Sequence, residues 1–269
     1  MHSRPIDHIV IAVQDLNQAC QHYRTLGFTI SPGGIHEQGY SHNALIHLAD
    51  GSFLELFAFR PGWRRMFLRL WNKWGMLDSK KQKLENGFLN RFLKGLYGRE
   101  GMIDFAIKVE DFTQQTATLR EEGLSLSADC PFSRLKPDGS RVSWELAFPE
   151  DLLLPFLMSG YDPPKQLPEA ATTHANGVKG IYGLSIASAT FDTHFQLFQQ
   201  LLAADPQIGR REGAPMATFD LGHQWVRLLE KNPDQEAGLV ELQLHGEQEI
   251  GPLELSKTHQ ARIHILARG

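Results

Sequence analysis

The sequence has few of the features that mark secreted, membrane-spanning or nucleic-acid-binding proteins. Only two of its 269 residues are cysteine, Cys20 and Cys130, too few for a disulfide framework and not in a metal-ligand spacing. No apolar run reaches the roughly 18 residues of a membrane-spanning helix, and the first residues do not resemble a signal peptide. A net charge of −4 argues against a nucleic-acid partner. These absences favour a soluble cytoplasmic protein.

Two common catalytic motifs are also missing. The chain has no Gly-Lys-Ser/Thr phosphate loop and no Gly-x-Ser-x-Gly nucleophile elbow. Its composition, 42% hydrophobic and 22% charged, is that of an ordinary globular protein. The length is enough for one or two domains with full hydrophobic cores.

One pattern of elements occurs three times along the chain. A strand-like run is followed by apolar residues at helical spacing and then by further strands in the segments that begin IDHIVIAV, MIDFAIKV and IYGLSIAS. Asp50-Gly51 and Asp138-Gly139 each join two apolar runs, as a tight hairpin turn does, and Leu221-Gly222 has the same place in the third copy. Each copy is therefore predicted to be a βαβββ unit, which gives an α+β fold.

The predicted helices of the first two copies carry end signals. Asp15 and Asp111 stand where the strand passes into the helix, so their carboxylates are expected to cap the helix N-termini. Gly27 and Gly123 follow the helices and are expected to end them in the left-handed conformation.

A Pro- and Ala-rich segment at residues 161–178 separates the second copy from the third. We expect it to link a domain at 1–160 to a C-terminal unit at 179–269. The extra strands GLVELQLHG and QARIHILAR of that unit either form a partial fourth unit or complete a sheet with a partner chain in a homodimer.

A basic, aromatic insertion at about 61–99 separates the first two copies. The segment from Arg60 to Glu100 holds eleven Lys and Arg against three acids, whereas the rest of the chain has 16 cations and 28 acids. Trp63, Phe67 and Trp74 belong to an apolar stripe at helical spacing. The favoured interpretation is a pair of helices packed over the domain; a lid over an apolar pocket and a membrane-surface contact are the alternatives.

His8 interrupts the apolar alternation of the first predicted strand. It shares a face with Val10 and Ala12, opposite Ile9 and Ile11. A histidine there is a metal ligand, a general acid or base, or a structural residue bonded to a carboxylate or carbonyl.

Glu55 is equally isolated in the apolar run SFLELF. A buried carboxylate without a partner is costly, so Glu55 needs a metal, a cation or a histidine beside it. This requirement makes a pairing of His8 with Glu55 more credible than a role for either residue alone.

The repeated unit that opens with DHIVIAVQDL resembles the vicinal oxygen chelate superfamily, which includes glyoxalase I, extradiol dioxygenases and bleomycin-resistance proteins. More narrowly, LGFTISPGGIHEQGYSHNALIHLADGSFLELFAF is similar to the glyoxalase-like domain family, with its Gly-Gly-x-His, Asn-Ala-Leu and Leu-Glu-Leu segments. The segments SRLKPDGSRVSWEL and HANGVKGIYGLSI extend the resemblance over nearly all of the chain except the insertion.

The resemblance implies curled mixed sheets in which two units enclose a cavity, with metal ligands on the first and last strands of a unit. It places His8 and Glu55 at such positions, as metal ligands and catalytic residues, with His36 as the predicted third ligand. His42 and His47 compete with His36. The implied cofactor is a divalent ion, Zn, Ni, Mn or Fe, and a metal-free site in which Glu55 acts as the base is the alternative.

The other units depart from this pattern. Aligning DFAIKVEDF with DHIVIAVQDL puts Phe105 opposite His8, and the third copy puts Gly183 there and Arg227 opposite Glu55. The second pair of metal ligands is therefore predicted to be missing.

Three further residues are candidates for binding a small-molecule substrate: Asn43, Trp144 and Arg141. Two functions stay open. One is a metal-dependent lyase, isomerase or dioxygenase acting on a substrate with vicinal oxygens; the other is a non-catalytic protein that sequesters a small molecule, as bleomycin-resistance relatives do.

Overall fold

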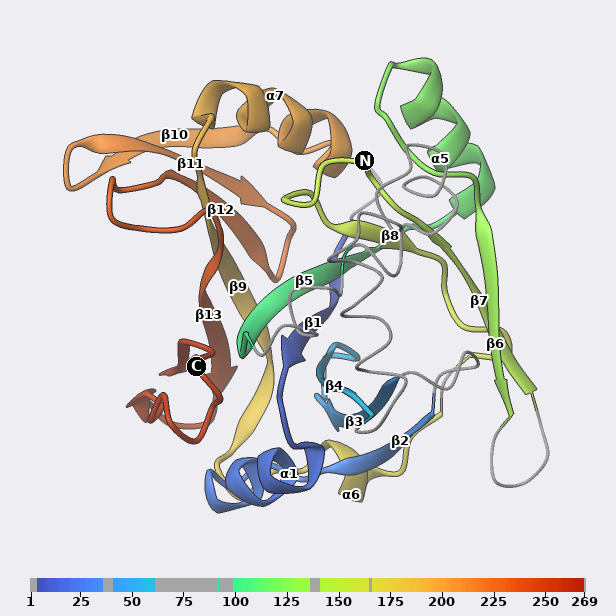
Figure 1. Ribbon diagram of the computed structural model, residues 1–269, viewed down its shortest axis with the longest axis vertical. Coiled ribbons are helices and arrows are strands. Elements are labelled where there is room, and N and C mark those ends of the chain that lie inside the picture. Colours follow the sequence, from blue (N-terminus) through green and yellow to red (C-terminus); the bar gives the residue numbers. More distant parts are fainter. Residues whose placement is uncertain are drawn as a thin grey trace, which may run out of the picture.

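The computed structural model describes residues 4–35, 41–60, 91, 99–135, 141–164 and 166–268. The chain forms two curled mixed sheets with few helices, which confirms the predicted fold class (Figure 1). Apart from Arg91 and Arg99, the predicted insertion lies outside the described residues. The Asp138-Gly139 turn lies outside them too.

Two βαβββ units build the eight-stranded sheet. The first comprises β1 (Ile6–Ala12), α1 (Leu16–Thr25), β2 (Ser31–Ile35), β3 (Ser41–His47) and β4 (Phe53–Phe59). The second comprises β5 (Gly101–Lys108), α5 (Phe112–Glu121), β6 (Cys130–Leu135), β7 (Arg141–Ala147) and β8 (Phe156–Met158). The strand order is β2-β3-β4-β1-β5-β8-β7-β6.

The third unit lies in a seven-stranded sheet, after the short helix α6 (Glu169–Thr172). It comprises β9 (Val178–Ser188), α7 (Phe191–Leu202), β10 (Pro206–Arg211), β11 (Ala214–Asp220) and β12 (Trp225–Glu230). The sheet is completed by β13 (Gly238–Gly246), β14 (Gly251–Pro252) and β15 (Ile263–Ala267). Its order is β10-β11-β12-β9-β13-β15-β14, so the extra strands pair within this chain as a partial fourth unit.

The same pairing recurs in both sheets. The first strand of a unit pairs in parallel with the last strand of that unit, as β1 does with β4 and β9 with β12. It also pairs antiparallel with the first strand of the next unit, as β1 does with β5 and β9 with β13. This arrangement brings the first and last strands of each unit to the centre of its sheet.

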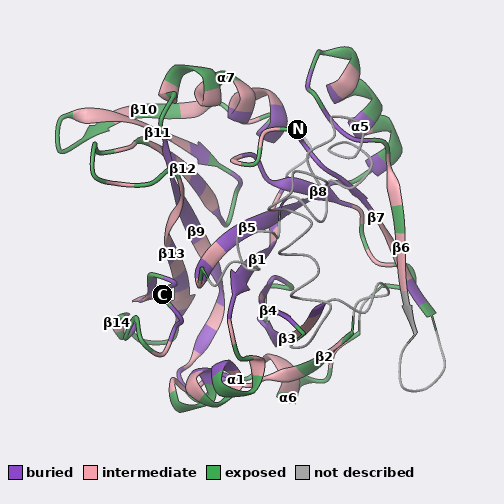
Figure 2. Cartoon of the chain, in the orientation of Figure 1, coloured by how far each residue is buried: buried purple, intermediate pink, exposed green. Residues whose placement is uncertain are grey.

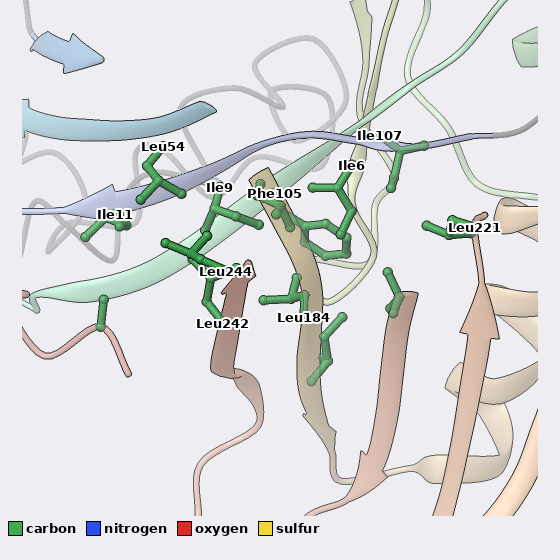
Figure 3. Close-up of a cluster of buried hydrophobic side chains, with 14 of the residues drawn as sticks. Ile6, Ile9, Ile11, Leu54, Phe105, Ile107, Leu184, Leu221, Leu242 and Leu244 are labelled. Atoms are coloured by element: carbon green, nitrogen blue, oxygen red, sulfur yellow. The ribbon is translucent and has the colours of Figure 1, made fainter. Parts of the chain in front are cut away.

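The main hydrophobic core lies between the two sheets. Figure 3 shows Ile9 and Phe105 of the first sheet facing Leu184 and Leu242 of the second, and buried side chains of α1, α5 and α7 belong to the same cluster. Buried residues follow the central strands, whereas β10 and the turn after it are largely exposed (Figure 2). One face of each sheet is thus committed to the core, and the opposite face is left for other contacts.

The helix ends agree with the sequence in three of four places. Asp15 accepts a hydrogen bond from the Gln18 amide at 3.0 Å, and Gly27 and Gly123 have φ values of 86° and 92°. The predicted cap at Asp111 was wrong, because this residue has φ 45° and makes no side-chain cap bond. A capping side chain needs an extended backbone to reach the amides of the first turn.

The described helices are all too short or too polar to cross a lipid bilayer.

Candidate functional site

A second, smaller apolar cluster lies on the far face of the eight-stranded sheet, opposite the main core. It contains Val10 and Ala12 of β1, Phe57 and Phe59 of β4, and residues of β5, β7 and β8. His8 lies two residues before Val10 on β1, and Glu55 lies two residues before Phe57 on β4. Residues two apart in a strand point to the same face, so both polar side chains lie on this face.

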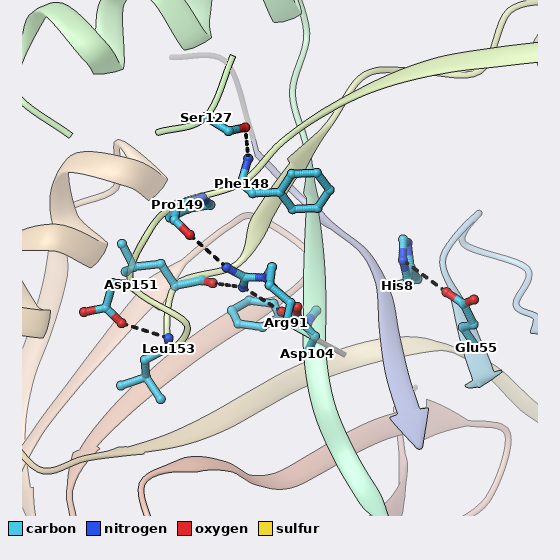
Figure 4. Close-up of polar contacts among 11 residues, drawn as sticks. His8, Glu55, Arg91, Asp104, Ser127, Phe148, Pro149, Asp151 and Leu153 are labelled. Atoms are coloured by element: carbon cyan, nitrogen blue, oxygen red, sulfur yellow. Dashed lines mark hydrogen bonds and ion pairs between the residues drawn. The ribbon is translucent and has the colours of Figure 1, made fainter. Parts of the chain in front are cut away.

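His8 is 5% exposed and lies between two aromatic rings. Its ring stacks on Phe53 with centroids 4.4 Å apart and meets the edge of Phe156 at 5.3 Å. The Nδ1 atom is 2.7 Å from Oδ2 of Asp7, and the Nε2 atom is 3.7 Å from Oε2 of Glu55. Because an ionised carboxylate only accepts hydrogen bonds, the contact with Asp7 places a proton on Nδ1 and leaves Nε2 facing Glu55 (Figure 4).

Glu55 is fixed from the other side by Asn43. The Asn43 Nδ2 atom donates to Oε1 of Glu55 at 2.7 Å, and the Asn43 Oδ1 atom accepts from the Gly34 amide at 2.9 Å. A side chain at Gly33 would put its Cβ 2.0 Å from Asn43 Oδ1, so glycine at this position allows the close approach. One carboxylate oxygen of Glu55 is therefore held by Asn43 while the other faces His8.

The predicted alignment of Phe105 with His8 was wrong by one residue. Phe105 pairs with Ile9 and points into the main core, whereas Asp104 pairs with Val10, a residue of the far face. Asp104 also precedes the α5 junction residue Asp111 by the same number of positions as His8 precedes Asp15. The second unit thus carries a carboxylate, not a phenyl ring, at the matching place.

The last strand of the second unit completes this comparison. Val10, two residues after His8, pairs with Glu55. Ala106, two residues after Asp104, pairs with Phe156. Phe156 therefore occupies the place of Glu55. In the third unit Ser185 pairs with Arg227, so the register agrees with the predicted match of Arg227 to Glu55.

Asp104 is held by Arg91, which belongs to the basic segment between the two units. Arg91 is 3% exposed, and its Nε and Nη2 atoms donate to the two Asp104 oxygens at 2.6 and 2.8 Å. It also donates to the carbonyls of Pro149 and Leu154 (Figure 4). The bidentate pair neutralises Asp104 and occupies both of its oxygens.

The three other histidines predicted as possible ligands differ in their position relative to His8 and Glu55. His36 is outside the described residues. His42 pairs with Ala58, a residue of the main core, so it points to the other face of the sheet. His47 is buried and meets the edge of Phe53 at 5.7 Å, on the side away from Glu55 along the strand.

Trp144 and Arg141 lie farther along the sheet. Trp144 is half-buried beside the far-face cluster, with its ring stacked 6.2 Å from that of Phe132 and edge-on to Tyr161. Arg141 is exposed and donates to Ser133 Oγ at 2.6 Å. Strand alternation puts Arg141 on the face opposite Trp144, so the structure does not bring it to His8.

The donor atoms present allow a test of whether a divalent ion fits. Two ligands about 2.1 Å from an ion at a tetrahedral angle are about 3.4 Å apart, close to the 3.7 Å between His8 Nε2 and Glu55 Oε2. The Asp7 contact with the other ring nitrogen is typical of metal-bound histidines. However, no group of three or more His, Cys, Asp or Glu converges on one point in the described part of the chain. The pair therefore fits one half of a metal site.

The sequence predicts His8, Glu55 and Asn43 as site residues, but it did not lead to Asp7, Asp104 and Arg91, which shape their surroundings. Asp7 could have been noticed as the neighbour of His8. Asp104 was hidden by the misplaced alignment, which matched it to Asp7. Nothing in the sequence distinguishes Arg91 from the other ten cations of its segment.

Comparisons with known proteins agree with this fold. A family model described as a glyoxalase-like domain matches residues 6–202, a range that includes the His8 and Glu55 strands. No curated protein matches the sequence.

Several solved structures are similar to the chain. A hypothetical protein from Staphylococcus aureus is 12% identical with a TM-score of 0.73, over 97% of this chain and 99% of that one. The 2,3-dioxygenase LapB from Pseudomonas sp. KL28 is 9% identical with a TM-score of 0.56, over 100% and 94%. The 2,2',3-trihydroxybiphenyl 1,2-dioxygenase from Sphingomonas wittichii strain RW1 is 12% identical with a TM-score of 0.51, over 91% and 74%. At these identities the likeness concerns the fold.

Proposed function

The chain belongs to the glyoxalase-like domain family of the vicinal oxygen chelate superfamily, and on that premise we propose that it is an enzyme whose reacting groups are His8 and Glu55. The observation that carries the proposal is the approach of His8 Nε2 to Glu55 Oε2 at 3.7 Å, each side chain being held from behind by a polar partner. Buried polar groups arranged in this way are typical of sites that move protons or bind an ion.

The residues around His8 and Glu55 have separate proposed roles. Asp7 keeps a proton on His8 Nδ1, so that Nε2 accepts a proton or a metal ion. Asn43 holds one oxygen of Glu55. In a metal-free site, Glu55 would instead be the base that takes a proton from the substrate and returns it. Phe53 and Phe156 flank His8 and exclude water from it.

The proposed substrate is a small molecule with oxygens on adjacent carbons. A divalent ion would be held by His8 and Glu55, with His36 as the predicted third ligand, and when bound it would polarise the substrate oxygens and stabilise a developing oxyanion. We propose a lyase, isomerase or dioxygenase reaction on this basis. Two of the similar folds belong to dioxygenases by name, which supports the reaction class without naming a substrate.

Metal analysis and thermal unfolding test the proposal. Protein purified without chelator should contain a divalent ion, or should be stabilised when Zn, Ni, Mn or Fe is added. His8→Gln and Glu55→Gln should each abolish that stabilisation, and the control His264→Gln, which alters a half-buried histidine in the other sheet, should retain it. Absence of bound metal and of stabilisation in the wild-type protein would remove the metal from the proposal.

The second candidate function is sequestration of a small molecule without catalysis. The observation that favours it is the Arg91–Asp104 ion pair, which occupies the position of the second unit that corresponds to His8. The rings of Trp144, Phe132 and Tyr161 offer an aromatic surface on the same sheet. Tight binding of an aromatic ligand that is unchanged by His8→Gln and by chelator would favour this function over the enzyme.

A further inference from the structure

The far face of the seven-stranded sheet carries a polar row that the proposed site does not use. Leu184 and Ile186 of β9 point into the main core, so the intervening Ser185 points to the far face. Ser185 is fully buried, and its Oγ atom has no hydrogen-bond partner. Buried hydroxyls are nearly always bonded, so an unsatisfied one marks a place where a partner is missing.

Strand register places a cation and a carboxylate on either side of this hydroxyl. Ser185 pairs with Arg227 on β12 and with Glu241 on β13. These three strands are neighbours at the centre of the sheet (Figure 1). Directly paired residues share a face, so Arg227, Ser185 and Glu241 form a row across it.

Arg227 is held in a fixed position but keeps hydrogen-bond donors free. Its guanidinium lies 4.3 Å from the centre of the Trp225 ring, and its Nε atom donates to Thr218 Oγ1 at 3.2 Å. Its two Nη atoms make no hydrogen bond to any residue in the described ranges. Trp225 itself covers Gly183, where a Cβ would lie 2.1 Å from the ring, so glycine permits this stack.

The carboxylate of the row does not neutralise Arg227. Glu241 Oε1 accepts from Gln243 Nε2 at 2.7 Å, and Oε2 lies 3.9 Å from Nη2 of Arg211. Glu241 therefore lies near two arginines, Arg227 of the row and Arg211 of β10. Burial lowers the pKa of Arg227, the Arg211 charge lowers it further, and Glu241 opposes both. An anion beside Arg227 would offset this unfavourable burial of charge.

We propose that this face binds a small monocarboxylate through Arg227 and Ser185. The two Nη groups of Arg227 match the two oxygens of a carboxylate, which is the bidentate geometry that arginine favours. The Ser185 hydroxyl donates to one of those oxygens and gains the partner that it lacks. Because Ser185 is fully buried, binding must displace a neighbouring side chain of the row.

Glu241 sets the selectivity of the proposed site. Its negative charge, one strand beyond Ser185, repels a second anionic group and accepts a hydrogen bond from a hydroxyl or amino group. The site is therefore expected to favour monocarboxylates such as acetate, lactate and benzoate over succinate and inorganic phosphate. It lies on a different sheet from His8, so it does not depend on the proposed function.

Calorimetric titration of the full chain tests this site. Wild-type protein should bind at least one of acetate, lactate and benzoate more tightly than succinate and inorganic phosphate. Arg227→Gln should weaken that binding about tenfold or more, since it removes a charged hydrogen-bond pair. Arg210→Gln is the matched control, because Arg210 is a nearby arginine whose Nη1 atom donates only to the Gly213 carbonyl.

Ser185→Ala keeps the test decisive if Arg227→Gln fails to fold. This variant should weaken carboxylate binding severalfold without lowering the melting temperature, because the hydroxyl has no partner to lose in the free protein. The proposal is overturned if no monocarboxylate binds the wild-type chain, or if binding is the same in wild type and Ser185→Ala. Equal binding of phosphate and monocarboxylates would also overturn it.

Discussion

In the first unit β1 and β4 present His8 and Glu55 to one another, whereas in the second unit β5 and β8 present Asp104 and Phe156 at the matching positions. The first pair leaves an imidazole nitrogen and a carboxylate oxygen 3.7 Å apart. In the second, Arg91 binds both oxygens of Asp104 and also lies over the Phe156 ring at 5.9 Å. The same pair of strands thus holds a histidine beside a carboxylate in the first unit and a buried arginine–carboxylate ion pair in the second.

The largest effect is expected from breaking the Arg91–Asp104 ion pair. Arg91→Leu should lower the free energy of unfolding by about 3–5 kcal/mol, because it leaves Asp104 buried and uncompensated. Urea denaturation measures this loss. The control is Arg99→Gln, which removes the exposed pair with Glu236 and should cost less than about 1 kcal/mol. Equal losses in the two variants would show that Arg91 is not a buried anchor.

The His8–Glu55 pair should depend on Asn43, which orients Glu55. Asn43→Ala removes the hydrogen bond to Glu55 and the acceptor of the Gly34 amide. We expect a loss of about 2 kcal/mol in unfolding free energy, within the range for bonds to charged groups. A stability equal to that of the wild-type protein would mean that Glu55 has another partner of equal value in solution.

Substitutions at the two helix N-termini should give smaller losses of stability. Asp15→Ala should cost about 1 kcal/mol, because the carboxylate accepts from the Gln18 amide. Asp111→Ala should cost less than Asp15→Ala, since Asp111 makes no such bond. Melting temperatures of the two variants measure the difference, and a larger loss for Asp111→Ala would contradict it.

The smallest effect on stability is expected from His174, which connects the segment before β9 to the first unit. His174 accepts from the Thr29 amide at Nδ1, 3.0 Å away, and Nε2 donates to the His47 carbonyl at 2.9 Å. Burial lowers the pKa of His174, the Lys179 charge lowers it further, and the bond to His47 opposes both. The folded state therefore binds this proton less readily than the unfolded chain does.

Stability should accordingly fall as the pH drops below about 6.5, the ordinary value for histidine. The contribution of one such group cannot exceed about 1.4 kcal/mol per pH unit. Unfolding curves of wild type and His174→Gln between pH 7 and 5 should show a shallower dependence in the variant. Parallel curves would contradict the prediction.

Much of this comparison could be predicted from the sequence because strand alternation is local. His8 and Glu55 each interrupt an apolar run, and the resemblance put them on adjacent strands, so their pairing followed. The repeat of strand, helix and hairpins was readable for the same reason, since Asp50-Gly51 and the glycines after the helices mark its turns.

The second unit was less predictable because its features depend on register and on distant residues. Both strands contain Ile-Asp, so Asp104 was aligned with Asp7. The correct alignment becomes visible only because Phe105 points into the main core. Arg91 acts through contacts with residues 13, 58 and 63 positions away along the chain. Similarly, the left-handed backbone of Asp111 cannot be inferred from an aspartate at a helix start.

The proton positions of His8 test the proposed His8–Glu55 site. Nitrogen NMR of the histidine-labelled protein, with His8 assigned by His8→Gln, reports which ring nitrogen carries hydrogen. We expect a protonated Nδ1 held by Asp7 and a Nε2 signal that shifts when Glu55→Gln is introduced or a divalent ion is added. A His8 ring with hydrogen on Nε2 and a bare Nδ1, unaffected by either change, would contradict the proposed site.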